Sequence, residues 1–131
     1  MTVTTTTTTT WPDDLADAFR SFERHFAAGD FDAIAEQYGP DAVLVWAPGE
    51  RAEGRAAIRA AFEAAHARGA GLTMEPRAFH IAGDLAVTSF VITFTGMTPD
   101  GSPVVTTSTE VLRRGTDGRW RFEVDDPFFS A

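Results

Sequence analysis

Cysteine is absent from the 131-residue chain. Its absence excludes disulfides, thiolate metal sites and a cysteine nucleophile, and it fits a reducing compartment such as the cytoplasm. No apolar run approaches the roughly 18 residues that a membrane-spanning helix needs. The N-terminus has neither a basic region nor an apolar stretch, so it is not expected to be a secretory signal. We therefore expect a cytoplasmic protein without a transmembrane helix.

The motifs of common cofactor sites are missing as well. The three histidines stand in no HxH, HxxxH or HExxH spacing, so no metal site is expected. GxGxxG, P-loop and GxSxG motifs are also absent. The first two absences argue against a dinucleotide cofactor and a phosphate cradle. The expectation is a protein that works with no cofactor.

Basic residues are few, with 11 against 19 acidic ones, and the formal net charge is −8. Such a chain repels nucleic-acid phosphates and anionic lipid, so neither nucleic acid nor a membrane is an expected partner. Acidity also favours solubility, so the charge says little about a ligand. A hydrophobic content of 44% and a length of 131 residues indicate one globular domain.

A threonine-rich segment precedes the predicted domain. Residues 1–10 include an unbroken run from Thr4 to Thr10 and offer nothing to bury, so we expect a disordered tail. An edge strand is the alternative, because β-branched residues favour extended structure. The domain is expected to cover residues 11–131, with Pro12 in the first helical turn.

Helical periodicity follows this segment. From Asp13 to Ala28, four apolar residues recur at intervals of four, three and four, which indicates an amphipathic helix (Leu15, Phe19, Phe22 and Phe26). A shorter helix carries Phe31 and Ile34 after the Gly29-Asp30 joint, where glycine can end one helix and aspartate can cap the next. A third helix begins after Gly54 and ends at Gly69.

Strand patterns take over in the remainder. A short strand, Ala42 to Trp46, is expected after a turn at Tyr38-Gly39-Pro40-Asp41. Four more strands are predicted, separated by Gly- and Asp-containing turns: Leu72 to Ile81, Leu85 to Thr95, Pro103 to Arg113 and Arg119 to Asp125. Helices followed by an antiparallel meander predict an α+β fold, with three N-terminal helices on a curved antiparallel sheet.

Alternation assigns the side chains of the Leu85–Thr95 strand to two faces. Phe90, Ile92 and Phe94 share one face with Thr88, and this face suits the wall beneath the helices. Val87 and Val91 lie on the other face with polar neighbours. That outer face is expected to form a homodimer, with a solvated face as the alternative.

Three segments carry a family resemblance: AAGDFDAI at 27–34, GRAAIRAAF at 54–62 and DGRWRF at 117–122. They resemble the nuclear transport factor 2-like superfamily, the cone-shaped, cystatin-like fold of ketosteroid isomerases and SnoaL-like polyketide cyclases. Within it, the chain resembles the branch of small stand-alone bacterial domains. The resemblance implies a ligand pocket inside the cone and dimerisation through the outer sheet face.

The resemblance does not extend to the ketosteroid isomerase machinery. In that family a tyrosine and a protonated aspartic acid stabilise an oxyanion while a carboxylate removes the proton. Carried onto this chain, the tyrosine falls on Phe22, the base on Trp46 or Ala47, and the protonated acid near Thr107. None of these side chains can perform those steps, so this mechanism is excluded.

SnoaL-like cyclases instead use a pocket aspartate, assisted by histidine. The candidate catalytic residues are Asp125, Glu123 and His80. Regular alternation puts Glu123 and Asp125 on one face, where two carboxyls near an apolar wall would raise at least one pKa. The alternative is that a nearby arginine pairs with them on the sheet surface.

The expected ligand is a small apolar or polyketide-like molecule. The residues predicted to line its pocket are Phe22, Tyr38, Trp46, Phe90, Phe94 and Thr107. Two functions remain open at this point. One is a cofactor-independent isomerase or cyclase that uses acid–base chemistry, and the other is a non-catalytic ligand-binding or dimeric assembly module.

Overall fold

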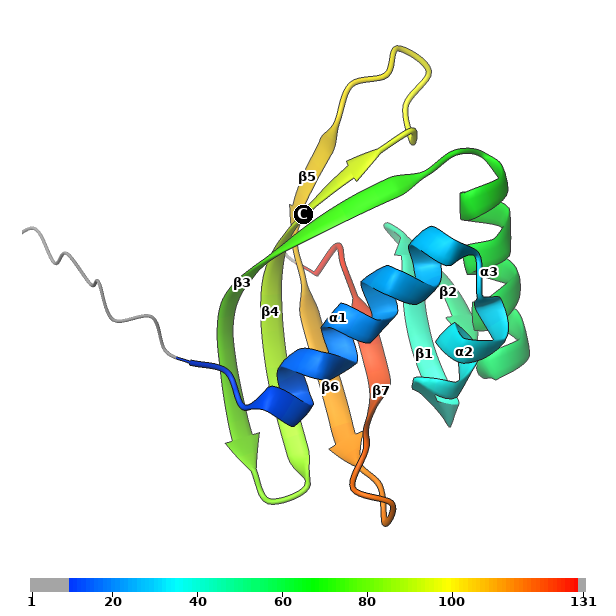
Figure 1. The fold of residues 1–131 in the computed structure, drawn as a ribbon. Coiled ribbons are helices and arrows are strands. Elements are labelled where there is room, and N and C mark those ends of the chain that lie inside the picture. Colours follow the sequence, from blue (N-terminus) through cyan, green and yellow to red (C-terminus); the bar gives the residue numbers. More distant parts are fainter. Residues whose placement is uncertain (1–9, 130–131) are drawn as a thin grey trace, which may run out of the picture.

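The computed structural model describes residues 10–129, so residues 1–9 of the predicted tail lie outside the described part. Three helices and seven strands follow in the order shown in Figure 1: α1 (Asp13–Ala28), α2 (Phe31–Glu36), β1 (Tyr38–Ala47), β2 (Glu50–Glu53), α3 (Arg55–Ala67), β3 (Gly71–Ala82), β4 (Leu85–Thr95), β5 (Val104–Thr107), β6 (Thr109–Arg114) and β7 (Trp120–Asp126). No helix among residues 10–129 is long and apolar enough to cross a membrane.

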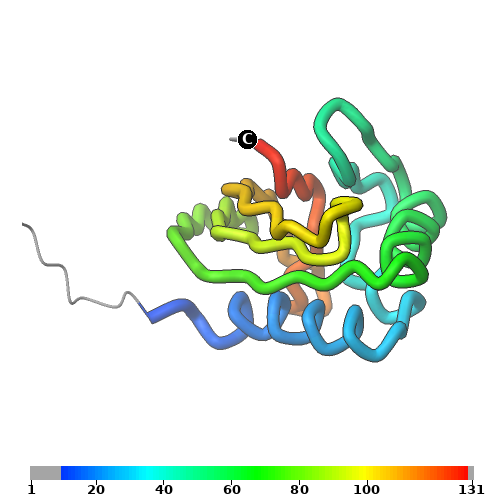
Figure 2. Tube along the Cα trace, turned by 90° about the horizontal axis from the view of Figure 1, so that it is seen from above, coloured from blue at the N-terminus to red at the C-terminus, as the bar shows by residue number. Residues whose placement is uncertain are grey.

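The strands form one curved sheet in the order β2-β1-β7-β6-β4-β3, with β5 paired to β4. Every pairing is antiparallel except β1 with β7, which is parallel, so the sheet is mixed. Figures 1 and 2 show α1 lying along the concave side of the sheet and α3 beside β1 and β2. The predicted α+β cone is therefore confirmed.

The core lies between α1 and the inner face of the sheet. All four apolar residues of the predicted α1 stripe are buried (Leu15, Phe19, Phe22 and Phe26). On β4, Thr88, Phe90 and Ile92 are also buried, whereas Val87 is 39% exposed. The period-two prediction for β4 therefore holds, and the sheet has an inner apolar face and an outer face with exposed valines.

The joint between α1 and α2 forms as its sequence predicts. Gly29 has φ of 70°, a left-handed conformation that glycine adopts without a Cβ clash, and it ends α1. The side chain of Asp30 then accepts a hydrogen bond from the Ala33 amide at 3.2 Å and caps α2. This joint turns the chain back so that the next strand can begin beside β7.

Two local predictions are wrong, and one strand was missed. Tyr38 to Asp41 is not a turn but the start of β1, and β2 was not predicted at all. The predicted strand Pro103–Arg113 is divided into β5 and β6 at Ser108. There the Ser108 hydroxyl accepts from the Phe90 amide at 3.0 Å, so a side chain replaces a backbone acceptor of the ladder.

Candidate acid–base site inside the cone

A row of polar side chains crosses the inner face of three neighbouring strands. Thr88 on β4 stands opposite Glu110 on β6, and Glu110 stands opposite Asp125 on β7. Residues that face each other across antiparallel strands have Cβ atoms about 5 Å apart. The register therefore holds two carboxyl groups next to each other inside the cone.

Hydroxyl groups hold both carboxyls in place. The Tyr38 hydroxyl donates to Asp125 Oδ2 at 2.5 Å, and the Thr88 hydroxyl donates to Glu110 Oε1 at 2.7 Å. Tyr38 is fully buried and Glu110 is only 3% exposed. Asp125 keeps part of its surface accessible because it borders a cavity. Each carboxyl has one oxygen engaged by a hydroxyl, which fixes the orientation of the group.

Burial is the main cause of the shifted pKa values in this row. Burial, followed by the charge of the neighbouring Asp125, raises the pKa of Glu110 to about 8, while hydrogen bonds from Ser108 and Thr88 act in the opposite direction. Burial also raises the pKa of Asp125 to about 6, although the Tyr38 hydrogen bond lowers it. Near neutral pH, Glu110 therefore keeps its proton while Asp125 is largely ionised.

The same environment keeps Tyr38 neutral. Burial, followed by the charge of Asp125 and the hydrogen bond to it, holds the pKa of the Tyr38 phenol well above 10. Its hydroxyl is therefore a permanent hydrogen-bond donor to Asp125. A donor of this kind stabilises the aspartate as an anion.

A β-bulge in β7 overturns the prediction for Glu123. The β6–β7 register pairs Val111 with Val124 but Leu112 with Phe122, so Glu123 is the extra residue of the bulge. Glu123 and Val124 therefore both lie on the outer face, and Glu123 pairs with Arg113 at 3.6 Å. The regular alternation of side chains between the two faces fails at Glu123. The alternative prediction, an ion pair with an arginine on the sheet surface, is observed for this residue.

Glu110 takes the place in the site that was predicted for Glu123. Glu110 was not among the predicted site residues, although the sequence carries a signal for it. Glu110 lies two residues before Leu112, which is fully buried, so both share the inward phase of β6. A carboxylate on the apolar phase of a strand is unusual, since such groups are rarely buried without a functional or structural partner.

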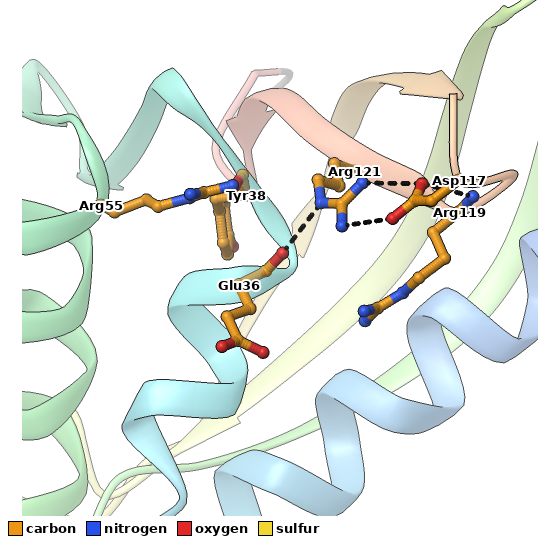
Figure 3. Close-up of polar contacts among 6 residues, drawn as sticks. All are labelled: Glu36, Tyr38, Arg55, Asp117, Arg119 and Arg121. Carbon is orange, nitrogen blue, oxygen red and sulfur yellow. Dashed lines mark hydrogen bonds and ion pairs between the residues drawn. The ribbon is translucent and has the colours of Figure 1, made fainter. Parts of the chain in front are cut away.

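The backbone that carries Tyr38 is held from two sides (Figure 3). Arg55 on α3 donates from Nε to the Tyr38 carbonyl at 2.8 Å. Arg121 on β7 donates from Nε to the Glu36 carbonyl at 3.2 Å, and its other two nitrogens bind both carboxylate oxygens of Asp117 at 3.0 and 2.8 Å. These contacts fix the α2–β1 junction and so position the phenol toward Asp125.

Asp125 and Glu110 line an inner cavity of about 50 Å³. That space holds about four water molecules. Apart from the two carboxyls its walls are apolar (Phe19, Phe22, Leu44, Phe62, Leu72, Met74, Ile92, Phe94, Phe122 and Pro127). The cavity can therefore accept a small apolar group next to one protonated and one ionised carboxyl.

A second cavity of about 70 Å³ lies next to the inner one, and the two share five lining residues (Leu44, Phe62, Leu72, Phe94 and Pro127). It is also lined by Trp46, which is 43% exposed, and by Met97, which is 41% exposed. We call this second cavity the mouth, because it adjoins the inner cavity and is also lined by side chains exposed at the surface.

The predicted lining residues divide into two groups. Phe22 and Phe94 line the inner cavity, Trp46 lines the mouth, and Tyr38 contacts Asp125. Phe90 instead packs between Trp11 and Phe19, at ring-centroid distances of 5.2 and 4.3 Å, and borders an outer groove. Thr107 stands opposite Val91 on the outer face and lines none of the described cavities.

His80 is also placed away from Asp125. It is exposed on β3, opposite Val87, and borders the outer groove between α1 and β3. Because Phe79 faces the core, alternation turns His80 to the outer side. The prediction that His80 assists Asp125 is therefore wrong. Within residues 10–129, no cluster of three histidine, aspartate or glutamate side chains could hold a metal ion.

Known structures of the same shape were found for most of the chain. A candidate calcium/calmodulin-dependent protein kinase II association domain from Xanthomonas campestris has a TM-score of 0.70 and 23% identity, covering 90% of this chain and 88% of that one. A nuclear transport factor 2-like protein with a cystatin-like fold from Novosphingobium aromaticivorans has a TM-score of 0.72 and 21% identity, covering 87% and 78%.

A third structure, a candidate dehydratase of the nuclear transport factor 2-like family from Streptomyces avermitilis, has a TM-score of 0.66 and 20% identity, covering 90% and 96%. At such identities these likenesses establish the fold alone. No curated protein matches the chain. The SnoaL-like domain family model matches residues 19–123, which include Glu110 and end two residues before Asp125. The chain therefore belongs to the SnoaL-like domain family.

Proposed function

We propose that the protein is a cofactor-independent acid–base enzyme of the isomerase or cyclase type, acting on a small apolar or polyketide-like carbonyl compound. The observation that carries the proposal is the Glu110–Asp125 pair on the wall of an apolar cavity. Environments that separate the pKa values of two neighbouring carboxyls assign one group as the acid and the other as the base. Fold membership alone leaves enzymes and binding proteins equally open.

Each residue has a role in the proposed reaction. The Asp125 carboxylate removes a proton from the carbon next to a carbonyl, and the electron pair of that C–H bond moves onto the carbonyl oxygen. The protonated Glu110 carboxyl donates a hydrogen bond to the oxygen as its negative charge grows. In an isomerisation of a β,γ-unsaturated carbonyl compound, Asp125 returns the proton to the far carbon of the dienolate as the double bond moves. In a cyclisation, the enolate carbon attacks a second carbonyl, and the alkoxide that forms takes the proton from Asp125.

Deuterium exchange tests the first step without knowledge of the natural substrate. 2-Indanone is a compact ketone with acidic C–H bonds, and NMR reports the loss of its α-hydrogen signals in D₂O. We expect the wild type to accelerate this exchange and Asp125→Asn to abolish the acceleration. Glu123→Gln is the matched control, because it removes a carboxyl from the same strand on the outer face. Equal rates in the wild type and Asp125→Asn would exclude Asp125 as the base.

The outer face supports the proposal that the protein is a homodimer. Val87, Val111, Val124 and Val43 stand side by side across β4, β6, β7 and β1. Val87 is 39% and Val124 40% exposed, so this valine row presents an apolar stripe on the sheet surface. Specific interfaces bury at least about 1,000 Å², and a sheet face of four strands can supply such an area.

Sedimentation velocity tests the dimer. We expect the 14.2 kDa chain to sediment as a dimer at micromolar concentration, and Val124→Glu to yield monomers that keep the wild-type circular dichroism spectrum. Arg119→Glu, a charge change at the β6–β7 turn, is the control and should stay dimeric. A wild type that is monomeric at these concentrations would exclude the interface.

A non-catalytic assembly module is the second candidate function. The valine row favours it, and the structurally similar protein from Xanthomonas campestris is described as an association domain. The deuterium exchange experiment separates the two candidates, because an assembly module needs no working Asp125. A cytoplasmic location, inferred from the lack of cysteine, belongs to the proposal as well.

A further inference from the structure

One charged side chain lines the otherwise apolar mouth of the cone. Arg68 borders this cavity together with Trp46, Met97 and Phe128, and no other charged residue does. The mouth shares Phe94 and four further apolar residues with the inner cavity. A molecule that reaches Asp125 through the mouth therefore passes Arg68.

The guanidinium of Arg68 is not used by the described part of the protein. Among the arginines of residues 10–129, only Arg68 and Arg119 have a guanidinium that makes neither a hydrogen bond nor an ion pair. Arg119 lies at the β6–β7 turn, and Figure 3 shows its guanidinium apart from Asp117. In Figure 1 this turn is at the bottom of the molecule, whereas the α3–β3 connection, which begins at Arg68, is at the upper right.

The backbone at Arg68 is held firmly against the sheet. Arg68 is the C-cap of α3, and Gly69 follows with φ of 80°. A Cβ added to Gly96 would lie 2.5 Å from the Gly69 carbonyl oxygen, so only glycine allows the two chain segments to come this close. The guanidinium is thereby tethered to a fixed point on the rim of the mouth.

The inner cavity and the mouth carry charges of opposite sign. The Glu110–Asp125 pair carries a negative charge when Asp125 is ionised, and this charge repels a second anion in a cavity with apolar walls. Arg68 attracts an anion, and its planar guanidinium suits carboxylate-like groups. The two ends of the cavity system therefore favour opposite ends of an amphipathic molecule.

We propose that the ligand is a small amphipathic molecule with one anionic group, which Arg68 binds at the mouth while the neutral, reacting end occupies the inner cavity. This inference rests on the proposed function, because it assigns the inner end to the chemistry of Asp125 and Glu110. Cavities of about 70 and 50 Å³ restrict the ligand to a small compound. Arg68 then determines specificity, and it takes no part in the proton transfer.

A pair of probes with the same apolar body tests the charge preference. 3-Phenylpropanoate carries a carboxylate, and 3-phenylpropanamide is its neutral counterpart. Binding of each is measured by calorimetry and by the fluorescence of Trp46, with Trp46→Phe identifying the part of the signal that comes from the mouth. We expect the acid to bind about 10-fold more tightly than the amide, as a charge-assisted hydrogen bond predicts.

Two variants show whether Arg68 causes this preference. Arg68→Gln should remove the roughly 10-fold advantage of the acid and leave the affinity for the amide unchanged. Arg119→Gln, which removes the other uncommitted guanidinium and the same charge, should leave both affinities unchanged. The melting temperature of each variant checks that the fold is retained, because Arg68 also stands at a helix C-terminus, where a cation is favourable.

Several results would overturn the inference. They are equal affinity for the two probes, an unchanged preference in Arg68→Gln, an equal loss in Arg119→Gln, or no binding of either probe at millimolar concentration. None of these depends on deuterium exchange. A charge preference that requires Arg68, combined with unchanged exchange in Asp125→Asn, would support the ligand class and reject the proposed enzyme. The reverse combination would reject the ligand class alone.

Discussion

Replacing Glu110 with glutamine should change how the free energy of unfolding depends on pH. Burial and the charge of Asp125 raise the pKa of Glu110 from 4.5 to about 8. Between these values the folded chain keeps a proton that the unfolded chain has released, so unfolding releases a proton. The stability of the wild type must therefore fall as the pH rises through this interval.

The size of the effect follows from the same shift. Each pH unit in the interval lowers the free energy of unfolding by about 1.4 kcal/mol, so the full interval corresponds to a loss on the order of 5 kcal/mol. The contribution of Glu110 is fully present below pH 4.5 and is lost once the pH exceeds about 8. A loss of this size is a large part of the 5–15 kcal/mol that is typical of a domain, on the order of a third or more.

Urea unfolding monitored by circular dichroism, from about pH 5 to about pH 9, measures this dependence. Glu110→Gln cannot ionise, and its amide oxygen can still accept the Thr88 hydroxyl. The variant should therefore match the wild type near pH 5 and become more stable than the wild type toward pH 8. A constant difference between the two proteins over this range would refute the reasoning.

A second carboxyl supplies the control. Asp117 is exposed and its pKa is lowered, chiefly by the hydrogen bonds from Arg121, so it stays charged over the whole range. Asp117→Asn should shift the stability curve without changing its slope. A changed slope in this variant would show that the slope does not report the titration of Glu110.

Three further predictions concern the same site and its surroundings. If the exchange reaction is catalysed, its rate should rise as Asp125 ionises near pH 6 and fall as Glu110 loses its proton near pH 8. Glu110→Gln should remove the falling limb of the measured pH–rate profile. Tyr38→Phe should move the rising limb to higher pH, because the lost hydrogen bond lowers the pKa of Asp125 in the wild type; an unmoved limb would exclude this role. Leu112→Ala, at a fully buried position, should lower the free energy of unfolding by about 2–5 kcal/mol in urea titrations, and a loss below about 1 kcal/mol would contradict the packing.

The helices and the long strand β4 were predictable because their patterns are regular. The α1 stripe keeps a helical period over four apolar residues, and the bounds of β4 match the prediction at Leu85 and Thr95. The glycine and proline of Gly39-Pro40 favour a turn, but both residues lie inside β1. There the parallel pairing with β7 is interrupted between Tyr38 and Val43, so a turn-like sequence is accommodated as an irregularity in the strand.

The candidate site was only half predictable, and the reason is geometric. Asp125 was expected to face the cone, and the structure places it there beside Phe94. The partner carboxyl could not be found from β7 alone, because Glu110 comes from β6 and only the sheet register brings the two together. Tyr38 was expected as a lining residue, yet its hydrogen bond to Asp125 spans 87 positions of the sequence and has no local signal.

The bulge at Glu123 leads to a final prediction, because it changes which deletions the site can tolerate. Phe122 and Asp125 both face inward although three positions separate them, since Glu123 is the extra residue between them. Deleting Glu123 restores the regular alternation and leaves Phe122 and Asp125 inward, at the cost of a surface ion pair with Arg113 worth at most about 1 kcal/mol.

The deletion variant should therefore fold and keep the pH-dependent stability that Glu110 gives the wild type. The opposite change is an alanine inserted between Val124 and Asp125, which moves Asp125 by one position and turns its side chain to the outer face. The insertion should separate Asp125 from Glu110 and abolish any exchange activity that the wild type has. If the deletion also abolished that activity, side-chain alternation alone would not explain the geometry of the carboxyl pair. The extra residue at position 123 would then be needed for the site.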